Sequence, residues 1–288
     1  MNKDLSSKVI LVTGATDGIG KAAAMNFAMR GADLTIVGRS NEKTAQVAAE
    51  LKQASGNNKI DFIICDLSRI ADVKKGAEEF KSKHQRLDIL VNNAGAVFKT
   101  PQKSPDGYEL TFALNHLGYF EMTVALMDLI RNTPHARVVS TSSGLQAIGN
   151  LDLEKTPTSL EGSGTNAYAT SKLANVLFTK ELQQRLKGTT ATANCFEPGI
   201  VRTQFGALSK DLGFFMNLAY KIVMPFMVTP EKGADSLIWL ATSPEASSLK
   251  GELVANRKPK TPNKQALNKN LAKDLWALSE KLCAQAIQ

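Results

Sequence analysis

Tyr168 and Lys172 are the residues of this sequence whose types and spacing point most directly to chemistry. They stand four residues apart near the start of a predicted helix over residues 166–186, so both side chains point from one helix face. A free phenol has a pKa near ~10, and a neighbouring ammonium lowers that pKa by favouring the phenolate. Such a tyrosine can act as an acid or base near neutral pH. The alternative is an amphipathic helix that carries Tyr-x-x-x-Lys by chance.

Other polar residues lie near the ends of predicted strands, where an open parallel sheet binds its ligands. Ser142 and Ser143 follow the fifth strand, and either hydroxyl could donate to a substrate oxygen. Asn115 lies in the helical segment before that strand. The chain leaves the sixth strand through Pro198, Gly199 and Ile200, which we expect to contact a bound cofactor.

A glycine-rich turn with the spacing G-x-x-x-G-x-G connects the first predicted strand to a helix. The first glycine permits the tight turn, and the other two let the backbone approach a phosphate and let the helix pack on the strand. The helix N-terminus offers unpaired N–H groups and a positive dipole to a pyrophosphate. A plain strand–helix turn is the alternative, but the position at the first strand favours a dinucleotide. The predicted cofactor contacts here are Gly14, Thr16, Asp17, Gly18, Ile19 and Gly20.

The residues after the second strand distinguish between the two nicotinamide cofactors. An NAD enzyme usually places an acidic residue there for the ribose 2′-OH, whereas this chain has Arg39 and Ser40, and no acid before Glu42. A guanidinium suits a 2′-phosphate, so the sequence predicts NADP(H), with a solvated surface arginine as the alternative. Strands three and four add the predicted contacts Asp66, Leu67, Asn93, Ala94 and Gly95.

Strands and helices alternate along the whole chain, and no repeat or Gly/Ser linker divides it. This alternation predicts an α/β, single-domain Rossmann fold, with a doubly wound parallel sheet of about seven strands and helices on both faces. The predicted strands cover residues 8–13, 34–37, 60–65, 87–92, 137–141, 190–196 and 253–255. We expect a dinucleotide-binding and catalytic domain over residues 1–256, with a substrate lid at about 203–229 and a basic, helical C-terminal extension at 257–288.

The charge balance leaves several anionic partners open. The 288 residues include 35 basic and 27 acidic side chains, a net charge of +8, which fits a nucleic acid, an anionic membrane surface or an anionic cofactor. The basic C-terminal tail has no interleaved aromatic residues, so we expect a solvated surface and no nucleic-acid partner. Aromatic and methionine residues at 205–228 predict a hydrophobic substrate, with core packing as the alternative.

The sequence disfavours an integral membrane protein, a disulfide-stabilised fold and a metal site. The N-terminus lacks the apolar segment of a signal peptide, and no uncharged apolar run reaches 18 residues, so we expect no integral membrane segment. A weak peripheral contact at residues 205–228 stays open. The three cysteines lie far apart and the three histidines lack metal-ligand spacing, so we expect no metal and reduced thiols in the cytoplasm.

Taken in chain order, these motifs resemble the short-chain dehydrogenase/reductase family. The matching residues run from the glycine turn through Asn93-Ala94-Gly95, Asn115, Ser143, Tyr168, Lys172 and Pro198-Gly199, and they span residues 8 to about 256. Three segments are most similar to the retinol-dehydrogenase-like branch of the family, namely residues 114–118, 171–175 and 274–279.

The resemblance implies a role for each candidate residue. Tyr168 would exchange a proton with the carbonyl or alcohol oxygen, and Ser143, rather than Ser142, would hold and polarise that oxygen. Lys172 would bind the nicotinamide ribose and lower the Tyr168 pKa, while Asn115 would hold a water of the proton relay. The positive charge of the nicotinamide would lower the Tyr168 pKa further.

The predicted function is an NADP(H)-dependent oxidoreductase. It would interconvert a carbonyl, either an aldehyde or a ketone, and an alcohol on a small hydrophobic substrate by hydride transfer. The alternative is a catalytically silent NADP(H)-binding sensor or scaffold on the same frame. Because the family is often dimeric or tetrameric, the resemblance also implies a homo-oligomer.

Overall fold

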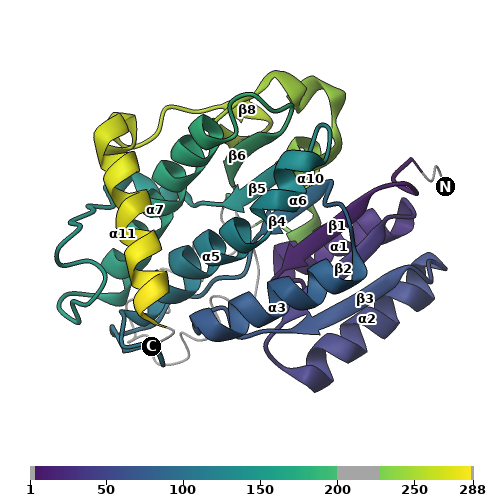
Figure 1. Ribbon diagram of the computed structural model, residues 1–288, viewed down its shortest axis with the longest axis horizontal. Coiled ribbons are helices and arrows are strands. Elements are labelled where there is room, and N and C mark those ends of the chain that lie inside the picture. The colour runs from purple at the N-terminus through teal and green to yellow at the C-terminus, as the bar shows by residue number, and fades with distance from the viewer. Residues whose placement is uncertain (1–3, 200–227, 287–288) are drawn as a thin grey trace.

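One sheet organises the part of the chain that the computed structural model describes, residues 4–199 and 228–286 (Figure 1). Its strand order is β3-β2-β1-β4-β5-β6-β7-β8, and all neighbouring strands are parallel except β7 and β8. The strands are β1 (Val9–Thr13), β2 (Asp33–Gly38), β3 (Ile60–Ile64), β4 (Ile89–Asn92), β5 (Arg137–Thr141), β6 (Thr192–Glu197), β7 (Leu253–Ala255) and β8 (Lys258–Pro259).

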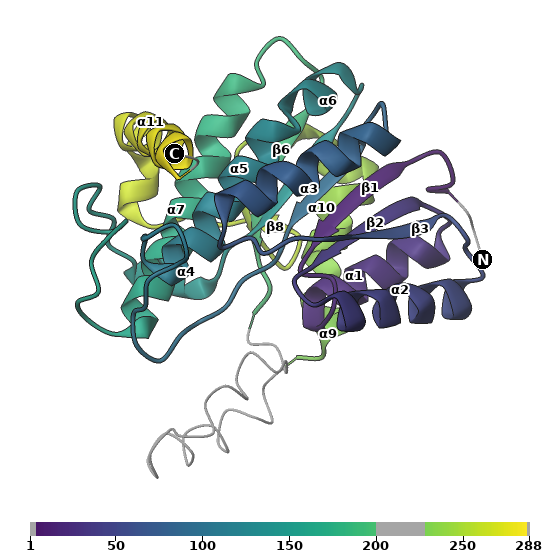
Figure 2. The same cartoon turned by 60° about the horizontal axis from the view of Figure 1, so that its bottom comes forward.

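Helices cover both faces of this sheet (Figure 2). One face carries α1 (Gly18–Met29), α2 (Asn41–Ser55) and α10 (Asp235–Thr242). The other face carries α3 (Ile70–Lys83), α5 (Gly118–Ala125) and α7 (Gly164–Arg185), with α11 (Lys269–Gln285) packed against α7. The shorter helices are α4 (Leu110–Phe112), α6 (Met127–Asn132) and α9 (Pro230–Gly233). The structure confirms the predicted doubly wound α/β fold.

The central strand β1 shows why the apolar runs of the sequence form parallel strands. Ile10, Leu11 and Val12 are all completely buried. Successive side chains point to opposite faces, so Leu11 packs in the core under α3 and α7, whereas its two neighbours pack under α1 and α2. A strand covered on both faces therefore needs a continuous apolar run rather than an alternating one.

Two features of the chain differ from the predicted elements. The two-residue strand β8 pairs antiparallel with β7 and was not predicted, because two exposed residues carry no apolar pattern. The helical segment expected around Asn115 begins at Leu110 and is interrupted by a π-helical turn, Ala113–Leu117, which precedes α5. π-Helical turns occur preferentially at functional sites.

The C-terminal helix α11 shares the main hydrophobic core with the rest of the chain. The Trp276 ring stacks on the Phe178 ring of α7, with a centroid distance of 5.8 Å and an interplanar angle of 11°. The hydroxyl of Tyr108 donates to the Leu282 carbonyl at 2.8 Å. The predicted division of the chain at residue 256 stays a prediction, although β8 and α11 share the sheet and core of the preceding residues.

Candidate functional site

The glycine turn lies directly against the loop that follows β4. Gly14 has a φ of 65°, and a Cβ placed on it would lie 2.5 Å from the Cα of Ala94. A Cβ on Gly20 would lie 2.2 Å from the Gly14 carbonyl oxygen. Neither position tolerates a side chain without backbone movement, so these two glycines are required for the close packing of β1, α1 and β4.

Asn93 connects the carboxyl ends of three neighbouring strands. Its Nδ2 donates to the Gly14 carbonyl at 3.1 Å, and its main-chain N–H donates to the Thr13 hydroxyl at 2.9 Å. Its Oδ1 accepts from the Thr141 hydroxyl at 3.2 Å. The predicted cofactor residue Asn93 therefore fixes the glycine turn of β1 against the ends of β4 and β5.

Two cations lie beside the glycine turn, and one was not singled out from the sequence. Asp17 caps α1 by accepting from the Gly18 N–H at 2.7 Å, and its carboxylate lies 3.5 Å from the Lys43 ammonium. Arg39 is exposed and follows Gly38, whose Cβ position would be 2.9 Å from the Thr16 methyl. Lys43 lies in the first turn of α2, four residues after Arg39, so its charge close behind the second strand was the signal that could have found it.

The other residues after β2 and β3 that were predicted to contact the cofactor have clear local contacts. The Ser40 hydroxyl caps α2 by accepting from the Lys43 N–H at 3.3 Å. Asp66 Oδ1 accepts from both the main chain and the hydroxyl of Ser68, at 3.0 and 2.7 Å. Leu67 is 4% exposed and packs against Gly118 at the start of α5. Ser40 and Asp66 thus shape the loop ends after β2 and β3.

Tyr168 and Lys172 extend from α7 toward the end of β5. The Lys172 Nζ lies 5.5 Å from the centre of the Tyr168 ring and donates to the Thr141 carbonyl at 3.1 Å. Burial lowers the pKa of Lys172 to about 7 and raises the pKa of Tyr168 to about 12, and a hydrogen bond with Ser143 opposes the rise. These protein groups alone do not lower the Tyr168 pKa, because burial outweighs the hydrogen bond with Ser143.

The two serines after β5 have different surroundings. Ser142 is completely buried, and its hydroxyl donates to the Lys172 main-chain carbonyl at 2.9 Å. Ser143 is half-buried, interacts with Tyr168 and accepts from the Leu145 N–H at 3.3 Å. The structure therefore brings Ser143 to Tyr168, whereas Ser142 holds the backbone of α7.

Asn115 stands in the π-helical turn and holds the loop after β4. Its Oδ1 accepts from the Ala96 N–H at 2.9 Å, and its Nδ2 donates to the Ala96 carbonyl at 3.0 Å and the Ser171 hydroxyl at 3.1 Å. A Cβ on Gly95 would lie 3.0 Å from Asn115 Oδ1 and 3.4 Å from Lys172 Nζ. The amide is thus engaged with protein groups, and the contact of Asn115 with a water of the proton relay stays a prediction.

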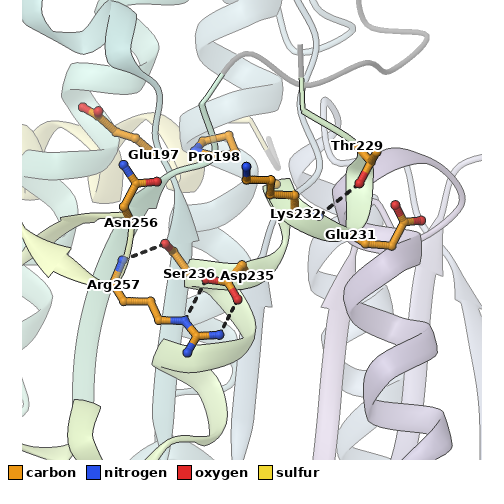
Figure 3. A pocket seen from close by; sticks show the side chains of 10 residues that line it. Glu197, Pro198, Thr229, Glu231, Lys232, Asp235, Ser236, Asn256 and Arg257 are labelled. Carbon is orange, nitrogen blue, oxygen red and sulfur yellow. Dashed lines mark hydrogen bonds and ion pairs between the residues drawn. The ribbon is translucent and has the colours of Figure 1, made fainter. Parts of the chain in front are cut away.

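A cavity of about 550 Å³ opens beside the end of β6 (Figure 3). Pro198 lines it, and the Arg257 guanidinium pairs with Asp235 across its wall, while the Arg257 N–H donates to the Ser236 hydroxyl at 3.1 Å. Tyr168 and Lys172 do not line this cavity. Gly199, next to it, has a φ of 76°. The predicted contact Ile200 and most of the predicted lid, 203–229, lie outside the described residues.

Two buried residues near Lys172 were missed by the sequence reasoning. The Tyr119 ring centre lies 5.4 Å from Lys172 Nζ. Asn175 Nδ2 donates to the main-chain carbonyls of Asn115, at 2.9 Å, and Thr141, at 3.2 Å. Helical spacing could have found both, because Tyr119 follows Asn115 by four residues and Asn175 follows Lys172 by three.

Comparison with known proteins identifies the family. A family model described as short chain dehydrogenase matches residues 8–211, which include the glycine turn, Asn115, Ser143, Tyr168 and Lys172. The chain belongs to the short-chain dehydrogenase family. The matched region covers most of the sheet whose geometry is described above.

Relatives of this short-chain dehydrogenase place it in the branch predicted from the sequence. Human retinol dehydrogenase 14 is 34% identical, with 96% of this chain and 86% of that protein covered. Human polyprenol dehydrogenase is 35% identical, with 94% and 84% covered. A short chain dehydrogenase from Escherichia coli CFT073, solved in complex with NADPH, is 25% identical, with a TM-score of 0.70 and 88% of this chain and 98% of that chain covered. The retinol-dehydrogenase-like resemblance is confirmed.

No helix within residues 4–199 and 228–286 combines the length and the apolar character needed to cross a bilayer.

Proposed function

We propose that this short-chain dehydrogenase uses NADP(H) to interconvert a carbonyl and an alcohol on a hydrophobic substrate, with Tyr168 as the proton donor and acceptor. The observation that carries this proposal is the meeting of Tyr168, Lys172 and Ser143 at the carboxyl end of β5, next to the glycine turn. Ligands of open parallel sheets bind at this edge.

The residues around the glycine turn fit a dinucleotide. Gly14 and Gly20 leave no room for side chains between β1, α1 and β4, so main-chain N–H groups line the turn where a pyrophosphate would bind. Arg39 and Lys43 place two positive charges after β2, which suits a 2′-phosphate and supports NADP(H) over NAD(H). The solved relative in complex with NADPH supports the same choice. The bound cofactor would supply the hydride chemistry and, when oxidised, a positive charge.

The protein groups would manage the proton at the substrate oxygen. In reduction, the Tyr168 Oη–H would donate its proton to the carbonyl oxygen, while the Ser143 hydroxyl would donate a hydrogen bond to that same oxygen. The Lys172 ammonium would stabilise the phenolate that remains on Tyr168. In oxidation the same oxygen of Tyr168 would accept the proton of the alcohol. Asn115 would hold the water that continues the proton relay.

Two observations support a hydrophobic substrate. The relatives named above are dehydrogenases of retinol and of polyprenol, which are both long apolar alcohols. The segment 205–228 is also rich in phenylalanine and methionine in the sequence, as expected for an adaptable apolar pocket. The cytoplasmic location, the homo-oligomer and the weak membrane contact stay predictions.

The test is NADPH oxidation with all-trans-retinal and a panel of other aldehydes and ketones. Tyr168→Phe should lower kcat by roughly 10³-fold, because it removes the acid, while NADPH still binds. Tyr108→Phe is the matched control, since its hydroxyl donates to the Leu282 carbonyl of α11 and its loss should leave kcat unchanged. Tight NADPH binding without turnover of any substrate would support the sensor or scaffold instead.

A further inference from the structure

The side chain of Gln146 fastens the turn that directly follows Ser143. This turn is a short 3₁₀ helix, Gly144–Ile148, and Gln146 within it is only 1% exposed. The Gln146 Nε2 donates to Glu197 Oε1 at 3.2 Å, and its Oε1 accepts from the Asn263 N–H at 2.9 Å. A buried amide is costly unless its polar atoms are bonded, and here each end is bonded to a different part of the chain. These two partners fix one orientation of the amide.

Glu197 receives the Gln146 amide at the carboxyl end of β6. The pairing of β5 with β6 ends where the Ser142 N–H donates to the Phe196 carbonyl at 2.8 Å. Ser143 and Glu197 are the next residues of these two segments. The bond from Gln146 to the Glu197 carboxylate therefore links the two segments beyond the end of their pairing. A hydrogen bond to a carboxylate is stronger than one between neutral groups.

The C-terminal part of the chain holds the same turn from a second side. The Lys260 ammonium donates to Glu197 Oε2 at 2.6 Å, so this buried carboxylate is paired. Asn263 Nδ2 donates to the Gly149 carbonyl at 2.9 Å, in addition to the main-chain bond described above. The 3₁₀ turn is thus bonded both to β6 and to the segment 260–263.

Ser143 depends on this turn for its position. Its hydroxyl accepts from the Leu145 N–H at 3.3 Å, and its main-chain carbonyl accepts from the Gln146 N–H at 3.0 Å. In the proposed function the same hydroxyl donates to the substrate oxygen. A displaced turn would therefore carry this hydroxyl away from the reacting groups, where small misplacements are costly.

We propose, on the basis of the function proposed above, that Gln146 and Glu197 are positioning residues that hold the Ser143 hydroxyl in place, with Lys260 and Asn263 as their anchors. Their effect on the reaction passes through Ser143. The competing explanation is that these bonds only fasten the C-terminal segment to the rest of the chain. Their loss would then lower stability and leave kcat unchanged.

Steady-state kinetics with NADPH and all-trans-retinal separate the two explanations. Gln146→Met keeps the length of the side chain and removes both hydrogen bonds of the amide. We expect kcat to fall by roughly tenfold while the Kd for NADPH stays unchanged. In a Ser143→Ala background the same substitution should lower kcat no further, because the hydroxyl through which it acts is already absent. Equal losses in the two backgrounds would overturn the proposal.

An exchange of the charged and the neutral partner tests the contact itself. Gln146→Glu sets two carboxylates against each other, and Glu197→Gln leaves two donors facing each other in either orientation of the new amide. Each single variant should therefore lower kcat. In the double variant the new carboxylate accepts from the Asn263 N–H and from the new amide, whose oxygen then accepts from Lys260. Its kcat should recover to within about threefold of the wild type, and no recovery would contradict the contact.

Gln183→Met is the matched control. Gln183 is a buried glutamine of α7, and its Oε1 accepts from the Ala193 N–H at 2.8 Å near the opposite end of β6. The control should lower Tm as Gln146→Met does, and it should leave kcat unchanged. A loss of kcat that follows Tm in both variants would show that weakened folding, not a displaced Ser143, lowers the rate.

Hydrogen exchange keeps the two proposals separate. Gln146→Met should speed the exchange of main-chain amides in the peptide covering residues 143–151, whereas Gln183→Met should not. Unchanged exchange in Gln146→Met would overturn the positioning role. Faster exchange, together with no turnover of any carbonyl by the wild type, would refute the proposed function alone.

Discussion

The Lys172 Nζ atom lies 5.4 Å from the centre of the Tyr119 ring, within the range of a cation–π interaction. The Tyr168 ring centre lies 5.5 Å from the same atom, so the ammonium meets an aromatic ring from each of two helices, α5 and α7. Burial has removed most of its water and lowers its pKa to about 7. The two rings and the Thr141 carbonyl therefore replace part of the lost hydration.

Tyr119→Leu should consequently weaken the placement and the charge of Lys172. We expect kcat to fall by about fivefold, which corresponds to about 1 kcal/mol of cation–π energy. Tyr119→Phe keeps the ring and should stay close to the wild-type rate in NADPH oxidation with all-trans-retinal. Equal losses of kcat in Tyr119→Leu and Tyr119→Phe would show that the cation–π interaction with this ring does not stabilise Lys172.

The cofactor preference should depend on the charges after β2. Arg39→Asp should weaken NADPH binding relative to NADH by roughly tenfold or more, because a carboxylate replaces the bidentate donor to the 2′-phosphate. Lys43→Ala should weaken NADPH by a smaller factor, since its ammonium is shared with Asp17. The measurement is fluorescence titration with both cofactors.

Lys52→Ala is the matched control for these charges. It lies in the last turn of the same helix, α2, roughly 13 Å along the axis from Lys43. We expect its NADPH and NADH affinities to equal those of the wild type. An unchanged ratio in Arg39→Asp would refute the role of Arg39.

The buried Lys172 should make stability depend on pH. Its folded pKa of about 7 lies below the ordinary lysine value of 10.5, so between these two pH values the unfolded chain binds more protons than the folded one. The free energy of unfolding contributed by Lys172 therefore rises with pH across this window, and is lowest below it. Lys172→Met should flatten that slope and stabilise the protein near pH 7 by about 1 kcal/mol or more.

The measurement is urea unfolding of both proteins at several pH values inside that window. The control variant is Lys187→Met, which replaces an exposed lysine in the loop after α7. We expect its free energy of unfolding to vary with pH as that of the wild type does. Parallel slopes for wild type and Lys172→Met would contradict the assigned burial effect.

The sequence predicted those features whose cause is local. A buried parallel strand needs a continuous apolar run, a tight phosphate turn needs glycine at Gly14 and Gly20, and helical spacing puts Tyr168 and Lys172 on one face. Each of these requirements acts within about ten residues of the chain. The alternation of strands and helices then predicted one parallel sheet, because right-handed crossovers leave few alternative topologies.

The missed features depend on contacts that are distant in sequence. Helical spacing puts Asn175 on the same helix face as Lys172, but it does not indicate that Asn175 bonds the carbonyls of residues 60 and 34 positions away. The raised pKa of Tyr168 arises from burial by elements that pack together only in the fold. The antiparallel strand β8 likewise exists only because β7 is there to pair with it.

Gly95 offers a direct test of how closely the loop after β4 approaches the proton-transfer groups. A Cβ at this position would lie 3.0 Å from Asn115 Oδ1, so the amide would have to shift by a few tenths of an ångström, and it would lie 3.4 Å from Lys172 Nζ, which is an ordinary contact distance. We expect Gly95→Ala to lower kcat by roughly tenfold and to weaken NADPH binding, because small misplacements at a reacting centre are costly.

Gly76→Ala is the appropriate comparison, since its Cβ would also meet buried neighbours, Cys65 and Ile63 at 3.4 Å, but lies within α3 and away from the site. The Gly76→Ala variant should retain the wild-type kcat. Because alanine favours a helix more than glycine does, its Tm should equal the wild-type value or be slightly higher. If Gly95→Ala turned over retinal as fast as Gly76→Ala does, the Asn115 amide would tolerate displacement, and its fixed position against the loop after β4 would not be what the reaction requires.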